Sequence, residues 1–300
     1  MLKFHITHKT IYTYELEATE SYSRLKISPL ETLCQNINSH SIELKPDVPV
    51  FSHRDYFDNL VYEFSLPFRH KHLEIIAKSE VTTFQTSKEP LKSEIKIREA
   101  ANWFQEFSLE FYDYLAPSGF VYFSEEVVKL SKRIFDPNRK LVEAIMDLNE
   151  IFTKEFKYKS GATNINTTID EAIKKRVGVC QDFSHIMIAV LRANGIASRY
   201  VSGYIESYNA SADTEMVGFE QSHAWVDVYI PYYSWLGIDP TNHMLSSEQH
   251  VRVAVGRDFE DVSPVRGTFK GAGRQFLRVE VQVRRMELDT KKLQEVEKAK

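Results

Sequence analysis

The first ninety residues alternate between hydrophobic and polar positions as β-strands do. Leu2, Phe4 and Ile6 alternate with polar residues, which is typical of a half-buried strand. Further hydrophobic runs follow at residues 24–27, 41–44, 60–64 and 73–84, with turn sequences between them. This spacing predicts an antiparallel β-sandwich or barrel over residues 1–90.

Residues 91–123 have no clear period. They contain an aromatic-rich stretch at residues 103–114, followed by the turn sequence Ala-Pro-Ser-Gly at 116–119. We predict a connector that packs against both halves of the chain. Its aromatic side chains are expected in a hydrophobic core, the alternative being a platform for a ligand.

A helical period begins at residue 124. Ser124, followed by two glutamates, is typical of a helix N-terminus. A second helix is predicted over residues 141–152, where hydrophobic residues recur every three or four positions. A third begins with the capping-box sequence that starts at Thr168, and Gly178 is expected to break it.

The fourth predicted helix begins at Cys180 and ends at Gly195. Its hydrophobic residues recur with helical spacing, so most of this helix is expected to be buried. Free backbone amides at a helix N-terminus carry a partial positive charge, which favours a thiolate. An isolated cysteine is nevertheless more often a small buried hydrophobe. Cys180 is therefore a candidate nucleophile only if a base and an orienting acid lie near it.

A predicted hairpin supplies both groups. Residues 221–230 and 235–239 have the pattern of two strands, with a turn between them. If the hairpin is centred on Pro231, His223 lies directly opposite Asp239, within reach of a carboxylate–imidazole hydrogen bond. The carboxylate would fix the imidazole tautomer so that the other ring nitrogen faces the thiol. A register shift of one residue would turn Asp239 to the opposite face, so the prediction depends on the turn.

Two alternatives compete with this interpretation. Asp227 lies on the same strand face as His223, two residues along and roughly 6.5–7 Å away, which is a poorer geometry for pairing. Asp182 and His185 lie close to Cys180 in the sequence and suggest a metal site. A single cysteine without a CxxC partner is poor zinc spacing, so we expect neither a metal nor another cofactor.

The composition excludes several classes of protein. Among 300 residues, 38 Lys and Arg against 42 Asp and Glu give a net charge of −4, which argues against a nucleic-acid partner. No hydrophobic run approaches the ~20 residues of a membrane-spanning helix, and the N-terminal residues lack the hydrophobic stretch of a secretory signal. Cys34 and Cys180 are too few for a disulfide framework. We therefore expect a cytoplasmic protein with two free thiols and no membrane partner, while the oligomeric state stays open.

Several segments resemble the transglutaminase-like superfamily. They are residues 176–204, which contain RVGVCQDFSH, the strand QSHAWVDVYI at 221–230, and WLGIDPTN at 235–242. The opening FHITHKTIYTY, the DYFDN segment at 55–59 and residues 253–273 are similar to a bacterial subgroup of predicted cysteine proteases. The resemblance covers most of the chain.

This resemblance implies a fold and a site. The fold would be α+β: a papain-like transglutaminase core, in which a helix with the cysteine packs on an antiparallel sheet with the histidine and the aspartate, preceded by an all-β sandwich-like N-terminal domain. Cys180 would be the nucleophile, His223 the base and Asp239 the orienting acid. The expected division is a β-rich domain at 1–90, the connector at 91–123, the catalytic core at 124–286 and a charged tail at 287–300.

The oxyanion hole is less well specified. The backbone N–H of Cys180 is a free amide at a helix end and therefore a good first donor. Tyr158 is a candidate for the second donor because Phe156-Lys157-Tyr158 resembles a family segment near the nucleophile. Gln181 is a weaker candidate.

These residues predict thiol-dependent acyl transfer at an amide or isopeptide bond through a thioester. Water as second nucleophile would give a cysteine peptidase or amidase, which we favour because water is abundant. An amine would give a protein-glutamine transglutaminase. A non-catalytic binding or scaffold module with a relic triad is the alternative from another class. The expected partner is a peptide or other amide-containing substrate.

Residues 1–90 contain no candidate nucleophile or base. We predict that they bind or position the substrate, since ligand clefts are common at domain junctions. The alternative is that they only cover a hydrophobic face of the core.

Overall fold

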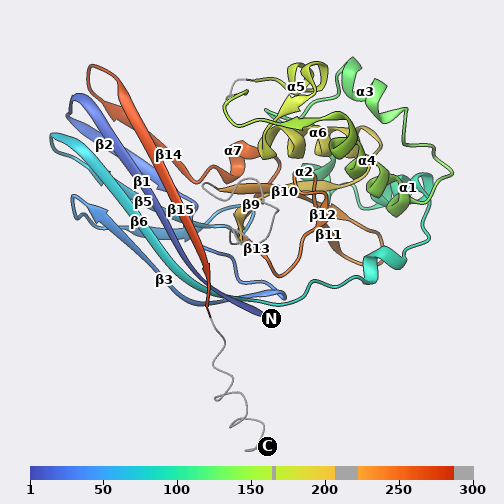
Figure 1. The fold of residues 1–300 in the computed structure, drawn as a ribbon, viewed down its shortest axis with the longest axis horizontal. Helices are drawn as coiled ribbons and strands as arrows, with labels where there is room; N and C mark the ends of the chain where they lie inside the picture. Colours follow the sequence, from blue (N-terminus) through green and yellow to red (C-terminus); the bar gives the residue numbers. More distant parts are fainter. Residues whose placement is uncertain (164–166, 207–221, 287–300) are drawn as a thin grey trace, which may run out of the picture.

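The computed structural model describes residues 1–163, 167–206 and 222–286, and it contains two lobes (Figure 1). One lobe is a β-sandwich, on the left in Figure 1, and the other is an α/β lobe on the right. The colours in Figure 1 show that the last described strands, in red, return to the lobe formed by the first strands, in blue. The charged tail expected at 287–300 lies outside the described residues.

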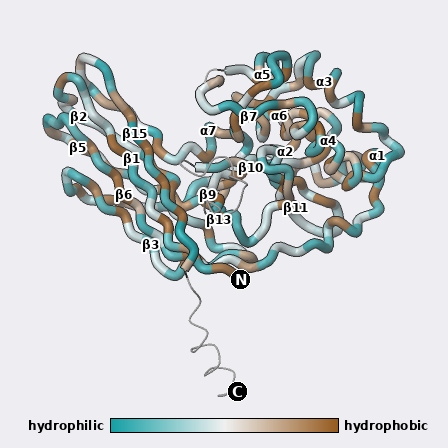
Figure 2. The backbone as a smooth tube through the Cα atoms, viewed as in Figure 1, coloured by the Kyte–Doolittle hydropathy of each residue, from teal (hydrophilic) through white to brown (hydrophobic). Residues whose placement is uncertain are grey.

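The β-sandwich consists of two four-stranded antiparallel sheets. In order across the sheet, the first contains β15 (Gln275–Arg285), β1 (Leu2–Ala18), β6 (His70–Thr83) and β3 (Gln35–Lys45). The second contains β14 (Val265–Lys270), β2 (Glu20–Leu25), β5 (Leu60–Leu66) and β4 (Phe51–Arg54). Buried side chains from both sheets, among them Leu25, Phe64 and Ile75, fill the space between them. Along these strands hydrophobic and hydrophilic residues alternate (Figure 2), so the sandwich predicted from the period of two is confirmed.

The two C-terminal strands belong to the sandwich and not to the core. β15 pairs with β1 from Phe4–Arg285 to Tyr14–Gln275, and β14 pairs with β2. The expectation that the core extends over 124–286 is therefore wrong for residues 265–285. An unpaired strand edge leaves a row of unsatisfied N–H and C=O groups, and β14 and β15 supply the hydrogen-bonding partners that β1 and β2 need on that side.

The α/β lobe is built on a five-stranded antiparallel sheet. Its order is β12 (Met244–Leu245), β11 (Trp235–Asp239), β10 (His223–Tyr229), β9 (Ser198–Ile205) and β13 (His250–Gly256). α6 (Cys180–Ala193) packs against β9 and β10 on one face of this sheet. Around α6 lie α3 (Glu125–Ser131), α4 (Leu141–Glu155) and α5 (Ile169–Lys175). The fold is therefore a helix on an antiparallel sheet, as expected.

The helix boundaries follow the capping signals of the sequence. The Ser124 hydroxyl accepts a hydrogen bond from the Val127 N–H, and Thr168 and Glu171 form a reciprocal capping box. α6 ends before Gly195, which has a φ of +70°. One boundary differs from the prediction, because α5 ends at Lys175 and the left-handed residue after it is Arg176, not Gly178.

The predicted connector is part of the α/β lobe. It contains α1 (Ile97–Glu106) and α2 (Tyr112–Leu115), after a short 3₁₀ helix η1 (Glu89–Lys92). Phe104 and Phe111 are buried in the same hydrophobic core as α6, and the Trp103 ring stacks on Tyr229 of β10 with centroids 5.8 Å apart. Phe104 and Phe111 therefore form core, whereas Phe107 and Tyr112 of the same stretch are exposed. The segment 91–123 adds its helices to the α/β lobe and also contacts the sandwich through Asp113, so it packs against both lobes as predicted.

The sandwich covers the face of the sheet that α6 leaves free. Because side chains alternate along β10, Ala224 and Val226 face the helices, while Trp225 packs with Leu30 and Phe57 of the sandwich lobe. Side-chain amides also fix the lobe boundary: Gln35 bonds the backbone of Arg252, and Asn59 bonds both the N–H and the C=O of Val255. The two lobes are thus joined along β13.

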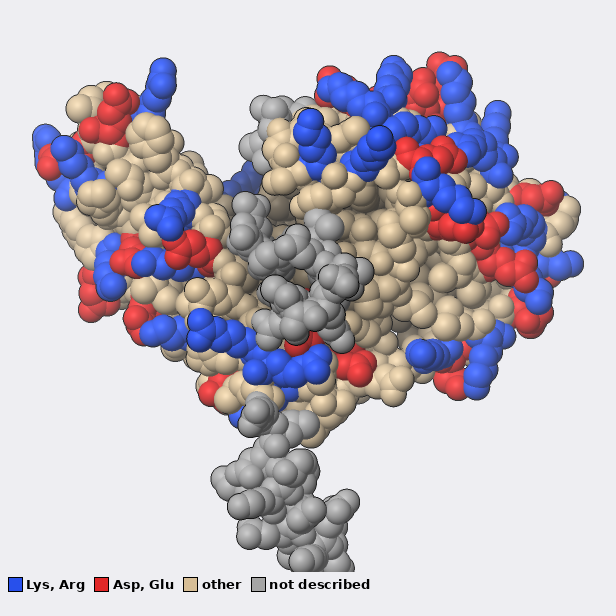
Figure 3. All heavy atoms as spheres, viewed as in Figure 1, with Lys and Arg blue, Asp and Glu red and all other residues tan. Residues whose placement is uncertain are grey.

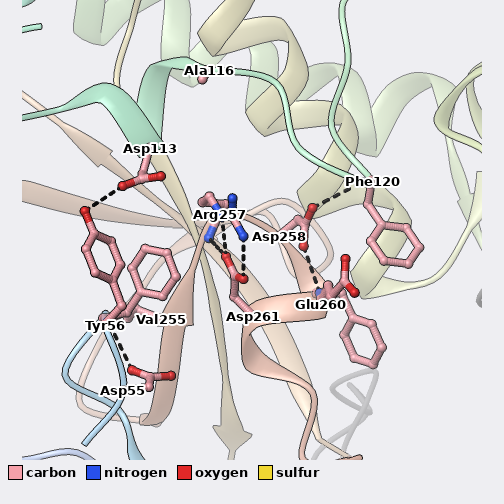
Figure 4. A network of polar contacts seen from close by, with 12 residues as sticks. Asp55, Tyr56, Asp113, Ala116, Phe120, Val255, Arg257, Asp258, Glu260 and Asp261 are labelled. Atoms are coloured by element: carbon pink, nitrogen blue, oxygen red, sulfur yellow. Dashed lines mark hydrogen bonds and ion pairs between the residues drawn. The ribbon is translucent and has the colours of Figure 1, made fainter. Parts of the chain in front are cut away.

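A polar junction lies beside this contact (Figure 4). The Tyr56 hydroxyl of the sandwich donates to Asp113 of α2 at 2.9 Å, and Arg257 binds Asp261 of α7 (Phe259–Val262) through two nitrogens. Together with Lys26, Asp55 and Phe57, these residues line an open cleft of about 440 Å³. On the face shown in Figure 3, basic and acidic side chains are intermixed over both lobes. Among the described residues, no helix has the length and hydrophobicity needed to span a membrane.

Candidate active site

Cys180 is the first residue of α6, at a tightly packed junction. Asp182 in the first turn accepts hydrogen bonds from the Val179 N–H (2.8 Å) and the Thr163 hydroxyl (2.7 Å). Gly178 permits this approach, because a Cβ at that position would lie 2.8 Å from the Cβ of Asp182. The chain thus passes directly from the short strand β8 (Val177–Gly178) into α6 and leaves Cys180 half-buried at the helix N-terminus.

The β10–β11 hairpin brings His223 and Asp239 together, in a register that differs from the predicted one. Val226 pairs with Ile238 and Asp227 with Gly237, so Asp239 lies opposite Trp225 and not opposite His223. The hairpin is therefore centred on Tyr232, which has a φ of 68°, and not on Pro231. A shift of two residues keeps every side chain on its face. His223 therefore reaches Asp239 diagonally, with Nε2 2.8 Å from Oδ2.

The orientation of His223 leaves one ring nitrogen free for a second partner. Nε2 is held by Asp239, whereas the buried Nδ1 has no hydrogen-bond partner among the described residues. Burial opposes the charged imidazole, but the charge and hydrogen bond of Asp239, together with the neighbouring Cys180, raise the pKa of His223 to about 10. The imidazolium form is thus favoured at neutral pH.

Asp239 is fully buried and is surrounded by hydrogen-bond donors. Oδ1 accepts from the backbone N–H groups of Thr241 (3.0 Å) and Asn242 (3.1 Å). Oδ2 accepts from His223, from the Asn242 side chain (2.8 Å) and from His250 Nε2 (3.2 Å). Burial alone would raise the pKa of Asp239, but the His223 charge and the imidazole hydrogen bonds hold it well below its usual value.

Asn242 and His250 were not among the site residues predicted from the sequence. Asn242 follows the acid in the turn Asp239-Pro-Thr-Asn, and a short polar side chain two or three residues after an aspartate was the signal available for it. His250 opens β13, two strands away from β10 in the sheet, and only the tertiary fold brings it to Asp239.

Asp227, the alternative acid, has other partners. It is fully buried and forms ion pairs with Arg199 (3.0 Å) and with Arg252. Burial would raise the pKa of Asp227, but the two arginines lower it. The structure thus places Asp239, and not Asp227, against His223.

Asp182 and His185, the residues of the alternative metal site, are engaged elsewhere. Asp182 caps α6, and His185 accepts a hydrogen bond from the Phe259 N–H (3.2 Å). Within the described ranges, His223, Asp239 and His250 have ligand atoms within 4.8 Å of one another and could together hold a metal ion. Asn242 already directs its N–H toward the same carboxylate oxygen. This set of donors suits a hydrogen-bonded carboxylate better than a cation.

Tyr158, the first candidate for the second oxyanion donor, is a neighbour of Cys180 from another element. It belongs to β7 (Lys157–Tyr158), which pairs with β8 directly before α6. Burial and the neighbouring Cys180 raise the pKa of Tyr158 to about 12, so its hydroxyl remains a donor at neutral pH. Gln181 is half-buried in the first turn of α6.

Comparisons with known proteins agree with this architecture. The model of the transglutaminase-like superfamily matches residues 128–240, and that of the bacterial transglutaminase-like N-terminal region matches residues 4–82. An uncharacterized protein of Mycobacterium tuberculosis is 34% identical over 279 residues, which are 88% of this chain and 87% of that protein. A Mycobacterium leprae protein, also uncharacterized, is 31% identical and covers 95% of this chain and 100% of its own.

Two further similarities involve proteins whose names refer to an activity. A protein-glutamine gamma-glutamyltransferase of Pseudomonas aeruginosa is 33% identical over 105 residues, which are 34% of this chain and 16% of that protein. The crystal structure of a candidate cysteine protease from Cytophaga hutchinsonii superimposes with a TM-score of 0.76 at 21% identity, covering 96% of this chain and 92% of that one.

The fold and the site define a papain-like core with a β-rich N-terminal lobe. The chain belongs to the transglutaminase-like superfamily and carries the bacterial transglutaminase-like N-terminal region.

Proposed function

We propose that this protein is a thiol-dependent acyl-transfer enzyme that cleaves an amide or isopeptide bond. Cys180 is the nucleophile, His223 the general base and acid, and Asp239 the residue that orients the imidazole. The observation that carries the proposal is the arrangement of His223, whose Nε2 is held 2.8 Å from Asp239 while its buried Nδ1 has no hydrogen-bond partner in the described part of the chain. A nucleophile, a base and an orienting third group are the parts that such chemistry requires.

The reaction has two halves. The Cys180 thiolate attacks the amide carbonyl and forms a C–S bond, and the negative charge moves to the carbonyl oxygen. When the tetrahedral intermediate collapses, the C–N bond breaks and the amine leaves with a proton from the His223 imidazolium, which leaves a thioester. Water then attacks the thioester and forms a C–O bond while His223 accepts its proton. The C–S bond breaks, which releases the carboxylic acid product and regenerates the Cys180 thiolate beside the His223 imidazolium.

Stabilisation of the oxyanion falls to donors at the start of α6. The Cys180 N–H lies in the first turn, where backbone amides have no partner within the helix. Tyr158 is our candidate for the second donor, because it lies beside Cys180 and retains its proton.

The second nucleophile separates two candidate activities. We favour water, because it needs no binding site of its own. Transfer to an amine is the second candidate, since the Pseudomonas relative bears the name of a protein-glutamine gamma-glutamyltransferase over the segment they share. A scaffold with a relic site is less consistent with an imidazole that is still held by its carboxylate.

Acyl capture on Cys180 tests the proposal. The full-length protein is incubated with a mixed library of glutamine-containing peptides, isopeptides and activated esters, quenched in acid and analysed by mass spectrometry. We expect an acyl adduct on the Cys180 peptide that is absent in Cys180→Ala. A fluorescent primary amine added in the same reaction then reports the ratio of hydrolysis to transfer. No adduct with any substrate, together with a Cys180 thiol no more reactive than Cys34, would contradict the proposal.

A further inference from the structure

His250 shares the acceptor oxygen of the proposed base. Its Nε2 lies 3.2 Å from Asp239 Oδ2, the same atom that receives His223 Nε2 at 2.8 Å. The side chain of His250 is 2% exposed and that of Asp239 is 0% exposed. One buried carboxylate oxygen thus lies between two imidazole rings from different strands, β10 and β13.

The backbone determines which nitrogen of His250 carries the hydrogen. The Ser247 N–H donates to His250 Nδ1 at 3.2 Å, so Nδ1 is the acceptor of the ring. In a neutral imidazole the other nitrogen then bears the hydrogen, and Nε2–H donates to Asp239.

Burial favours the neutral form of His250. It faces Asp239 from β11 and His223 from β10, and Arg252 lies on its own strand. Burial lowers the pKa of His250, and His223 and Arg252 lower it further against the opposing effect of Asp239. A neutral donor stabilises the carboxylate without adding a second cation that would compete with the His223 imidazolium for it.

Packing fixes the ring in this place. Trp225 contacts His250 edge to face with centroids 5.1 Å apart, and it lies beside the His223 ring at 6.1 Å. β13 is itself held from the sandwich side by the Gln35 and Asn59 side chains. The donor is therefore built into the lobe boundary, and its position does not depend on a flexible loop.

We propose that His250 is a positioning residue of the active site, whose neutral imidazole donates from Nε2–H to Asp239 and holds this carboxylate ionised and directed at His223. This inference rests on the proposed function, because it assigns His250 a task in preparing the base. A residue with a merely structural role would fill the same space without affecting the ionisation of Asp239.

Carboxyl NMR of the full-length protein, labelled with ¹³C at the aspartate side chains, tests the assignment. Asp239 is identified by the resonance missing in Asp239→Asn. In His250→Leu we expect the Asp239 carboxyl to titrate at a pH higher by about one unit, because one charge-assisted hydrogen bond to it is lost. His250→Gln retains an N–H donor, so its Asp239 carboxyl should titrate close to the pH of the parent protein. In His250→Leu, the pH below which iodoacetamide alkylation of Cys180 slows down should also move upward.

His8→Gln is the matched control. His8 is likewise a buried imidazole at the lobe boundary, but it bonds Tyr204 (2.8 Å) and Thr10 (3.2 Å), so its loss should leave the Asp239 titration unchanged. If His250→Leu does not fold, His250→Asn, whose shorter side chain cannot reach the carboxylate, takes its place.

The assignment is overturned if folded His250→Leu or His250→Asn shows the same Asp239 titration and the same pH dependence of Cys180 alkylation as the parent protein. It is likewise overturned if His250→Gln behaves like His250→Leu. Since the carboxyl titration needs neither substrate nor a reactive thiol, this failure is distinct from failure of the proposed function, which would show as the absence of acyl capture on Cys180.

Discussion

His223 meets Asp239 diagonally across the β10–β11 hairpin, with Nε2 2.8 Å from Oδ2, while Trp225 occupies the position opposite Asp239. Diagonal neighbours across an antiparallel pair are farther apart than direct ones but remain within reach of long side chains. The imidazole therefore extends along the strand direction, and its other nitrogen points away from the carboxylate.

This relationship predicts different effects for the two buried aspartates of the sheet. Asp239→Asn should retain the fold and lower kcat by roughly 10²–10⁴, because an amide in place of the carboxylate disturbs the His223 tautomer and no longer stabilises the imidazolium. Asp227→Asn should affect kcat much less. It should instead lower the free energy of unfolding by about 3 kcal/mol, because it leaves Arg199 and Arg252 without their common counter-charge.

Steady-state turnover and urea unfolding of the two variants separate these effects. The opposite pattern, in which Asp227→Asn abolishes turnover and Asp239→Asn only destabilises, would show that the orienting acid has been assigned to the wrong carboxylate.

Sequence patterns were sufficient to predict the helix that begins with Cys180 and the face of the sheet that each side chain of the hairpin occupies. They did not predict the register of the two strands. The faces follow from the alternation of hydrophobic residues in β10, because these residues must face α6. The register depends on the turn, where Tyr232 adopts a left-handed φ that few non-glycine residues take, so nothing in the local sequence indicated the two-residue shift.

Long-range pairing was the other feature that the sequence pattern could not supply. β14 and β15 alternate like any edge strand, and their position beside β2 and β1 is determined by which sheet edges are free in the folded chain. His250 was missed for the same reason, since its contact with Asp239 joins strands that are separated by two others in the sheet.

The two thiols should differ in their reactivity. Cys180 lies beside an imidazole that is favoured in its charged form, whereas Cys34 is a half-buried thiol in the sandwich lobe. At pH 6 we expect iodoacetamide to alkylate Cys180 at least ~10-fold faster than Cys34, because the imidazolium favours the neighbouring thiolate. His223→Ala should remove the difference. Peptide mass spectrometry measures both rates in one sample, and equal rates in the parent protein would count against an activated nucleophile.

The stability conferred by His223 should depend on pH in a definite direction. Its pKa is about 10 in the folded protein, above the ordinary 6.5 of an unfolded chain, so the folded state binds the proton more tightly. The stabilisation is complete below about pH 6.5 and is lost as the pH rises through 10. The difference in free energy of unfolding between the parent and His223→Ala should therefore be largest near pH 6 and decrease toward pH 10. Urea titrations across this range measure it, and a difference that grows with pH would contradict the assigned charge state.

The sandwich lobe covers a hydrophobic face of the sheet and fixes β13 through Gln35, whose side chain bonds the C=O of Leu30 and both backbone groups of Arg252. A chain truncated to begin at Ser124 would lose this cover together with α1, so it cannot separate covering from substrate positioning.

The full-length variant Gln35→Ala can separate these two roles. It removes the side-chain partners of the Leu30 C=O and the Arg252 N–H, while the Arg252 C=O still accepts from the Leu30 N–H. It should lower the free energy of unfolding by about 2–4 kcal/mol, whereas Asn36→Ala, an exposed neighbour on β3, should change it by less than about 0.5 kcal/mol.

If the lobe only supports the core, turnover of a small activated ester and of a larger peptide should fall by the same factor in Gln35→Ala, because both depend on the position of β13, which carries His250. The contacts of the sandwich with the buried face of the sheet favour this result over the substrate-positioning role predicted from the sequence. A selective loss of peptide turnover, with ester turnover and thermal stability retained, would instead assign the lobe a direct role in holding the substrate. Because the ester reports the chemistry at Cys180 and the peptide reports the chemistry and extended binding together, their ratio distinguishes the two roles.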